Sequence, residues 1–558
     1  MSFCQRSGKS NLLTRSLKML SRCFHFRGFI PVGFKEEIVK QAAIAVPASV
    51  ALFMDYSVPL ISTLFCGHLG RTELAGVALA NAIINVTGVS IGIGLSSACD
   101  TLMSQTFGSG NVKRVGVILQ RAILILLLAC VLSWTILLNT EPILLAIGQD
   151  PHVVKISQKY VKIFMIALPA SFAYQLESRY LQIQEIIWPQ VICGVVAVCI
   201  SALTNYIFLF VLGLGVAGSA GANAISQYSM AITLFLYIQW KGLHKITWAG
   251  WSKECLQEWG DYIRLAIPSL IVVSIEWWTF ELGGFLAGLL NEVELGTQAI
   301  VYELANVALM ISYGFSIAGS VRVGNALGAG ETESAKRSAK VSIACALLVS
   351  VCVAIIFGAT KDVIAYVFSN DEQVRNRVAQ VMVIYAPFHI IDAPGQAASS
   401  IMKGLGKQKI GAICSTLSYY GIGLPIGLSL MFAAKLGVTG FWVGLLICVF
   451  FLSVFVITYL IKMDWRKATE EALERAGVEV NCTETEESPE EQQLLDDTAE
   501  DHSDTHALLE ASDVVAVTTV GRLLSTRELV LRRGLALGVT LTIFTAGVIA
   551  HLLLSRDD

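Results

Sequence analysis

Long apolar segments separated by short polar ones dominate this chain of 558 residues. A helix that crosses a membrane needs about 20 mainly apolar residues. Twelve such segments follow one another, at 42–66, 75–98, 115–138, 160–178, 189–212, 216–240, 262–289, 297–319, 340–359, 379–402, 411–433 and 438–461. A thirteenth lies at 534–554. The pattern predicts an all-α protein that crosses a membrane many times.

Composition agrees with a membrane protein and excludes other classes. The chain is 54% hydrophobic and 15% charged, whereas soluble domains carry roughly a quarter charged residues. A net charge of -3 provides no basic surface for nucleic acid. The cysteines show no CxxC or Cys/His spacing that would predict a metal site. GNALGAG lacks the Lys-Ser/Thr of a phosphate loop, and no catalytic motif stands in its proper context, so we expect neither ATP nor an enzyme.

The distribution of charge predicts the orientation in the bilayer. Residues 1–41 form a basic arm without a signal-peptide pattern, and the loops on the same side hold most of the remaining Lys and Arg. The positive-inside rule therefore predicts a cytoplasmic N-terminus and an extracellular C-terminus. Residues 462–533 should form a cytoplasmic disordered linker, because Glu479–Asp513 is acidic and lacks Lys and Arg.

An internal repeat divides the apolar region. LGVAG at Leu214–Gly218 returns as LGVTG at Leu436–Gly440, an offset of about 220 residues. We expect two six-helix lobes, 42–240 and 262–461, joined by a cytoplasmic linker at 241–261. Because six is even, both lobes start on the same side, with a pseudo-two-fold axis along the membrane normal and a cleft between them. Such duplicated bundles are typical of secondary transporters.

Two glutamates interrupt the seventh apolar segment. The stretch SIEWWTFE contains Glu276 and Glu281, with Trp277, Trp278 and Phe280 beside them. An ionised carboxylate at the centre of a membrane helix costs at least about 2.5 kcal/mol, so it must be neutral, paired or facing water. A carboxylate there can hold a proton or an organic cation, but not both at once. Aromatic faces attract such a cation by roughly 0.5–2 kcal/mol.

Two further acids lie inside later segments. Glu303 has Tyr302 beside it and Asn306 one turn on, and Asp392 precedes Pro394, which removes a helix hydrogen bond. Broken backbone at membrane depth is tolerated beside protein or a wet cavity, although a simple packing kink explains Pro394 equally well. An ion pair with a fixed cation is the structural alternative for all these acids. No Lys or Arg lies centrally in a neighbouring segment.

The first half contains fewer polar residues within its apolar segments. Asn85 and Asn205 are expected to form interhelical hydrogen bonds. Asp100 lies near the repeat partner of Arg322, which predicts a structural ion pair between the lobes. Asp55 lies mid-segment, and the sequence assigns it no role.

Several long motifs resemble the multidrug and toxin extrusion (MATE) transporters of the vertebrate type with a thirteenth helix. They cover about residues 35–470 and include CGHLG, INVTGVS, GLSSACDTLMSQTFGS, LQRAIL, RLAIPS, EWWTFELGGFLAG, VELGTQAIVYELA, GFSIAGSVRVGNALGAGE and YYGIGLPIGL. The resemblance implies two lobes around a V-shaped cavity, alternating access, and a peripheral thirteenth helix. It also implies a plasma-membrane location, apical in polarised epithelia.

The resemblance further implies roles for particular residues. Acidic positions important in the family match Glu276, Glu281 and Glu303. A fourth falls at Asp392, where relatives carry Glu, and Phe280 stands where relatives often carry Tyr. We therefore expect export of small organic cations in exchange for protons, with the proton gradient as driving force and no cofactor or metal.

Three alternatives stay open. Carboxylates and Asn oxygens can also bind sodium, which would make the exporter sodium-coupled. A lipid-oligosaccharide flippase would favour a cationic cavity, against the acidic one expected here. A receptor that binds cations without moving them is disfavoured by the duplicated lobes.

Overall fold

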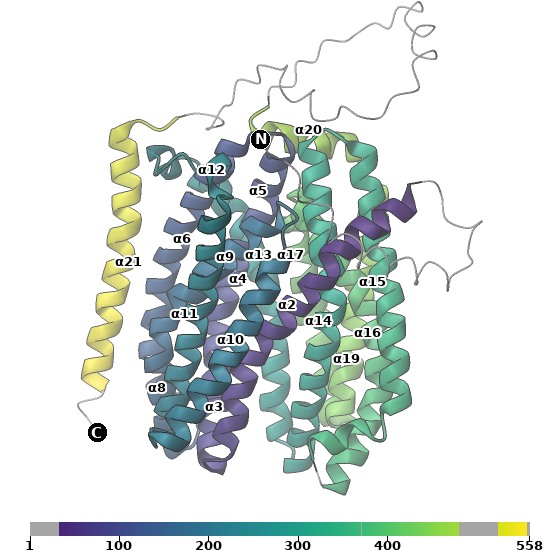
Figure 1. Ribbon diagram of the computed structural model, residues 1–558. Coiled ribbons are helices and arrows are strands. Elements are labelled where there is room, and N and C mark those ends of the chain that lie inside the picture. Colours follow the sequence, from purple (N-terminus) through teal and green to yellow (C-terminus); the bar gives the residue numbers. More distant parts are fainter. Residues whose placement is uncertain (1–32, 370, 479–519, 521–522, 555–558) are drawn as a thin grey trace, which may run out of the picture.

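The computed structural model describes residues 33–369, 371–478, 520 and 523–554, and these residues form helices with no strand among them. The long helices run side by side (Figure 1). Ten continuous helical segments of the described chain are long and apolar enough to cross a membrane. The prediction of an all-α protein with many membrane-spanning helices is confirmed.

The first half of the chain supplies six long helical segments, several of them composite. They are α2 (Phe34–Gly67); α3 (Arg71–Ile84) with η1 (Asn85–Val89), α4 (Ser90–Ser96) and α5 (Ala98–Gly108); α6 (Val112–Leu138); α8 (Pro151–Phe164) with η2 (Met165–Ala167) and α9 (Leu168–Gln182); α10 (Trp188–Tyr206) with η3 (Ile207–Val211); and α11 (Gly215–Lys241). The short helices α7 (Thr140–Ala146), α12 (His244–Thr247) and η4 (Lys253–Leu256) lie in connections.

The second half repeats this plan and adds one helix. Its long segments are α13 (Trp259–Gly288); α14 (Glu292–Gly328); α15 (Thr332–Thr360); α16 (Glu372–Leu405); α17 (Gln408–Thr416) with η6 (Leu417–Gly423), α18 (Leu424–Leu428) and η7 (Ser429–Ala433); α19 (Val438–Lys462); and finally α21 (Thr526–Leu554). The short helix η5 (Ile364–Val367) and the amphipathic α20 (Trp465–Ala476) complete the fold.

Local caps explain why two helices are longer than the apolar pattern predicts. The fourth segment was expected at 160–178, but α8 begins at Pro151, because Asp150 Oδ1 accepts from the His152 N–H at 2.9 Å. Its apolar run is then interrupted by the 3₁₀ turn η2. Similarly, Asn291 Oδ1 accepts from the Glu294 N–H at 2.8 Å and starts α14 before residue 297.

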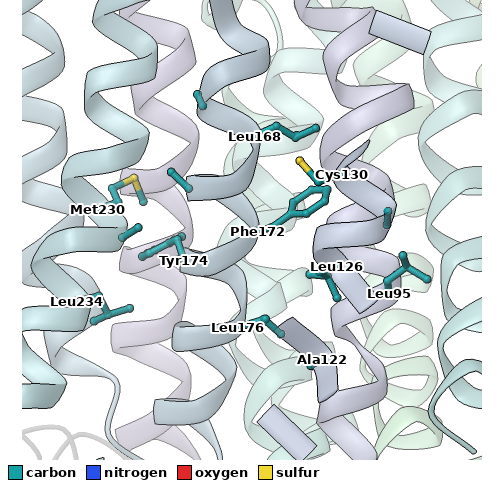
Figure 2. Close-up of a cluster of buried hydrophobic side chains, with 14 of the residues drawn as sticks. Leu95, Ala122, Leu126, Cys130, Leu168, Phe172, Tyr174, Leu176, Met230 and Leu234 are labelled. Atoms are coloured by element: carbon teal, nitrogen blue, oxygen red, sulfur yellow. The ribbon is translucent and has the colours of Figure 1, made fainter. Parts of the chain in front are cut away.

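Buried side chains form separate cores in the two halves. One core unites α3 to α11, and a second unites the membrane portions of α14, α16 and α19. Figure 2 shows part of the first core, where Phe172 and Leu176 of α9 lie opposite Cys130 and Leu126 of α6. The start of α13 also packs into this first core, through Trp259 and other residues. The fold is therefore two bundles that share contacts along one seam.

Helix α2 is a second element shared between the bundles. Near its start it packs so closely on α14 that a Cβ at Gly314 would clash with the Ala45 carbonyl oxygen. Near its end it packs on α10, where Asn205 Nδ2 donates to Ser62 Oγ at 3.1 Å. The helix thus crosses from one bundle to the other, as its diagonal course in Figure 1 shows.

The bundles touch closely at the end where α20 lies (Figure 1). There α5 meets the last turns of α14, and neither Gly108 nor Gly328 leaves room for a Cβ against the facing backbone. Gln105 Nε2 donates to the Gly404 carbonyl at 2.8 Å. Among the described residues, the hydrogen bonds between the bundles run from this end to the middle of the helices and do not reach the opposite end.

Helix α21 lies at the edge of the bundle against α6 (Figure 1). Asn139 Nδ2 donates to the Gly547 carbonyl at 3.1 Å, and Gly547 itself fits closely against Thr135. A thirteenth helix at the periphery is what the sequence predicted. The acidic segment Glu479–Asp513 that precedes it lies outside the described residues.

Candidate functional site

One pair of predicted acids meets between α13 and α16. Gln396 Nε2 lies 2.6 Å from Glu276 Oε1 and 3.4 Å from Asp392 Oδ1, so a single amide group bridges both carboxylates. Asp392 is 8% exposed, whereas Glu276 is half-buried. The proline-containing α16 brings Asp392 and Gln396 to the same face, because they are four residues apart.

The space beside this pair is very small. Glu276, Asp392, Gln396, Ser415 and Tyr419 line a cavity of about 10 Å³, together with several apolar side chains. A cavity needs at least roughly 10–15 Å³ to hold one water molecule. This cavity can therefore hold a proton or a bare ion, but not a bulky organic cation.

The second pair of predicted acids lies further along α13 and on α14. Glu281 and Glu303 lie within electrostatic range of each other. The Tyr302 hydroxyl lies within electrostatic range of Glu276 as well as of both these residues. All three glutamates are half-buried rather than sealed in a core. Tyr302 thus lies near all three glutamates, in an acidic region that spans about one and a half turns of α13.

Aromatic rings flank this second pair. Phe280 lies 5.7 Å from Tyr302 and 6.0 Å from Trp442, measured between ring centroids. Trp277 is half-buried, but Trp278 is 46% exposed and its Nε1 lies 3.4 Å from the Val86 carbonyl of η1, across the seam. The predicted aromatic residues therefore divide into two groups, and Phe280 and Tyr302 are those next to the glutamates.

Glu303 also contacts the other bundle. Tyr56 of α2 donates its hydroxyl hydrogen to Glu303 Oε2, and Asn306 Nδ2 lies 3.4 Å from the same hydroxyl oxygen. The predicted polar residue Asn306 therefore belongs to the site through Tyr56. The sequence did not single out Tyr56, since nothing local to α2 reveals a partner 247 residues away.

None of the four carboxylates forms an ion pair within the described part of the chain. Lys403, near the end of α16, lies within electrostatic range of Glu276 but forms no ion pair with it, so the alternative of structural ion pairs finds no support. Within the same residues, no group of three His, Cys, Asp or Glu side chains could hold a metal ion. What the arrangement can hold is positive charge that arrives from outside the protein.

The predicted ion pair between Asp100 and Arg322 is wrong. Asp100 pairs with Arg179 of α9, inside its own bundle. Arg322 instead pairs with Glu37 at 2.5 Å and Glu185 at 2.9 Å. The repeat predicts which helix ends correspond, but not which neighbour a long side chain reaches, and α9 lies beside α5.

The two asparagines differ. Asn205 forms the interhelical hydrogen bond to Ser62 that the sequence predicted. Asn85 opens the π-helix η1, and within the described residues its side chain forms no hydrogen bond. Its position is next to Val86, the residue whose carbonyl faces Trp278.

Two further acids lie inside the first bundle. Asp55 and Glu177 both lie within electrostatic range of Tyr174, whose side chain lies on the opposite side of α9 from Phe172 (Figure 2). Glu177 Oε2 is buried and has no hydrogen-bond partner among the described residues. The sequence analysis noted Asp55 but missed Glu177, although a Glu between apolar residues in LPASFAYQLES is visible there.

A duplicated bundle of membrane-spanning helices with unpaired carboxylates in its interior defines the class: a multi-pass membrane transporter. The sequence model of the MatE family matches residues 47–207 and 268–428, once in each half. Multidrug and toxin extrusion protein 1 of Danio rerio is 54% identical over 546 residues, which cover 95% of this chain and 92% of the relative. The Homo sapiens protein 1 is 50% identical over 461 residues, 83% and 80% of the two chains.

This chain belongs to the MATE family of multidrug and toxin extrusion transporters. Solved structures agree on the fold. The crystal structure of the eukaryotic MATE transporter AtDTX14 matches with a TM-score of 0.77 at 29% identity, covering 80% of this chain and 100% of that one. The Vibrio cholerae MATE transporter VcmN in its bent form matches with a TM-score of 0.69 at 16% identity, covering 79% and 99%.

Proposed function

We propose that this transporter exports small organic cations across the plasma membrane, apical in polarised epithelia, in exchange for protons. The observation that carries the proposal is the set of four intramembrane carboxylates without a fixed cation, arranged as two pairs. Glu276 and Asp392 face a space too small for more than a proton or bare ion. Glu281 and Glu303 lie beside the rings of Phe280 and Tyr302.

This division assigns the two pairs different tasks. The pair beside the aromatic rings attracts the organic cation, through charge and through the ring faces. The enclosed pair takes up protons. Protonating it removes negative charge close to the bound cation, which weakens cation binding and favours release. The proton and the cation therefore oppose each other through the charge of neighbouring carboxylates, and this opposition is the basis of exchange.

The conformation of the bundle supports alternating access. The bundles are joined at the end that carries α20, which the positive-inside rule places in the cytoplasm, and described hydrogen bonds between them do not reach the other end. We therefore interpret this conformation as outward-facing, with a cytoplasmic N-terminus and an extracellular C-terminus. Protons entering from outside would reach the acids and release the cation.

Uptake into proteoliposomes with an acidic lumen tests the proposal. A radiolabelled organic cation should accumulate without sodium, and Glu276→Gln should reduce accumulation at least about tenfold, because a neutral amide cannot take up and release the proton that drives exchange. Glu292→Gln makes the same chemical change at an exposed residue at the start of α14 and should leave uptake intact. Uptake that requires sodium, or that survives Glu276→Gln, would contradict proton exchange at this pair. No accumulation at all by the unmodified chain would favour a receptor.

A further inference from the structure

The hydrogen bond from Tyr56 to Glu303 is unusual in its position. It joins an N-lobe helix, α2, directly to a carboxylate of the C-lobe, near the middle of the seam between the bundles. A carboxylate offers its strongest interactions to charged partners and to short O–H donors. The Tyr56 hydroxyl occupies a Glu303 oxygen that a cation would also seek.

The other groups around Glu303 do not replace this donor. From α13, Glu281 contributes another negative charge, and on α14 itself Tyr302 and Asn306 face the same region. From α16, the Tyr385 hydroxyl lies 3.5 Å from the Ala305 carbonyl oxygen. Within the described residues, Tyr56 is the group hydrogen-bonded to the Glu303 carboxylate.

Helix α2 is built so that a change at Tyr56 can move the seam. Prolines at 47 and 59 lie inside the helix on either side of Tyr56. Each removes a helix hydrogen bond, so the segment between them is bounded by two weak points. The part of α2 before this segment packs on α14, and the part after it packs on α10. Tyr56 therefore sits in the portion of α2 that passes from one bundle to the other.

We propose that the Tyr56 hydroxyl is the resting partner of Glu303, which an arriving cation or proton must displace. Because Tyr56 belongs to α2, displacing it releases one of the hydrogen bonds that hold the two bundles together at mid-membrane. Occupation of Glu303 is thereby linked to movement along the α2–α14 seam. Tyr56 is a positioning residue that acts through Glu303, and the inference rests on the proposed exchange of cations and protons.

Tyr56→Phe separates this role from simple packing, since it removes only the hydroxyl. Without the competing donor, Glu303 holds both cation and proton more tightly, and release becomes slower. Removing a hydrogen bond to a charged group corresponds to about a tenfold change in the affinity of the species that competes with it. In proteoliposomes, KM for the cation should fall about tenfold, and kcat should fall with it. An unchanged or raised KM would overturn the proposal.

Ser49→Ala is the matched control. Ser49 Oγ donates to the Ile311 carbonyl at 3.0 Å, so it supplies another α2–α14 hydrogen bond that touches no carboxylate. It should leave KM unchanged, because loosening the seam alone does not alter what Glu303 binds. If Ser49→Ala lowered KM as Tyr56→Phe does, the effect would belong to the seam and the inference would fail.

A thermal-unfolding cycle provides a readout that does not depend on transport. Tyr56→Phe should lower the Tm in the native background and lower it less in a Glu303→Gln background, where the acceptor is a neutral amide oxygen and not a carboxylate. Additive shifts would show that Tyr56 does not act through Glu303, even if transport by the unmodified chain is proton-driven. If the Tm shifts are non-additive but the unmodified chain shows no proton-driven uptake, the proposed exchange is rejected, whereas the link between Tyr56 and Glu303 is retained.

Discussion

Replacing Gln105 by Met tests whether the contacts between the two bundles at the α20 end form a gate that holds this end of the protein closed. Gln105 lies on α5 and is fully buried. Its Nε2 donates to the Gly404 carbonyl at 2.8 Å, and its Oε1 accepts from Arg475 Nη1 at 2.6 Å. Both partners belong to the other bundle or to α20. Met fills a similar volume but forms neither bond, so the change removes polar contacts without opening a large cavity.

The expected magnitude follows from these two bonds. A neutral hydrogen bond contributes about 0.5–1.5 kcal/mol and one to a charged group about 1.5–3 kcal/mol. Their sum is about 2–4.5 kcal/mol. When the gate opens, water can bond to the Gln105 side chain and to its two partners, so removing these hydrogen bonds destabilises only the closed state. At 1.36 kcal/mol for each factor of ten, the open population should rise at least about 30-fold.

Amide hydrogen exchange measures this population, because α5 is sealed against α14 only while the gate is closed. Exchange across α5 should accelerate about 30-fold in Gln105→Met. Gln190→Met is the matched control, since Gln190 is equally buried but its bond to the Ser178 carbonyl, 2.9 Å long, stays within one bundle. Unchanged exchange in α5, or the same acceleration in both variants, would refute the assignment of Gln105 to a gate.

Two further outcomes are expected. Asp392→Glu adds a methylene beside a cavity of about 10 Å³, so stability should fall by about 1–3 kcal/mol, measured as a lower Tm. On α20, burial alone would raise the pKa of Glu471, but the hydrogen bond from Lys407 together with the positive charges of Lys407, Arg475 and Lys467 outweighs it, and the pKa is lowered from 4.5. A folded-state pKa below the unfolded one stabilises the protein above pH 4.5, and this contribution is lost as the pH falls below that value. Protection of the α20 amides, measured relative to their intrinsic exchange rates, should therefore decrease only below about pH 4.5.

The carboxylates could be predicted from sequence because charge inside an apolar run has few explanations. Glu276, Glu281, Glu303 and Asp392 all lie in the interior of membrane-spanning helices. Gln396 could also have been found, since it lies one turn after Asp392 on the same face. These features depend on helical spacing alone, which the sequence specifies.

Contacts between distant helices could not be predicted in the same way. Tyr56 meets Glu303 only because α2 crosses from one bundle to the other, and no local pattern encodes that course. The same limit explains the failed pairing of Asp100 with Arg322. Repeat symmetry relates backbone positions, whereas an ion pair depends on which neighbouring helix is within reach of one side chain.

The separation of the two acidic pairs sets how strongly protons can influence the cation. Glu276 and Glu281 are five residues apart on α13 and point to different sides, which places their carboxylates about 13 Å apart by helix geometry. At an effective dielectric constant of about 20, one charge changes the energy at the other by about 1.3 kcal/mol. Productive coupling between sites is typically about 1–3 kcal/mol. In the proposed exchange, a proton held at Glu276 can therefore weaken a cation near Glu281 nearly tenfold without touching it, so the two species need not share one pocket.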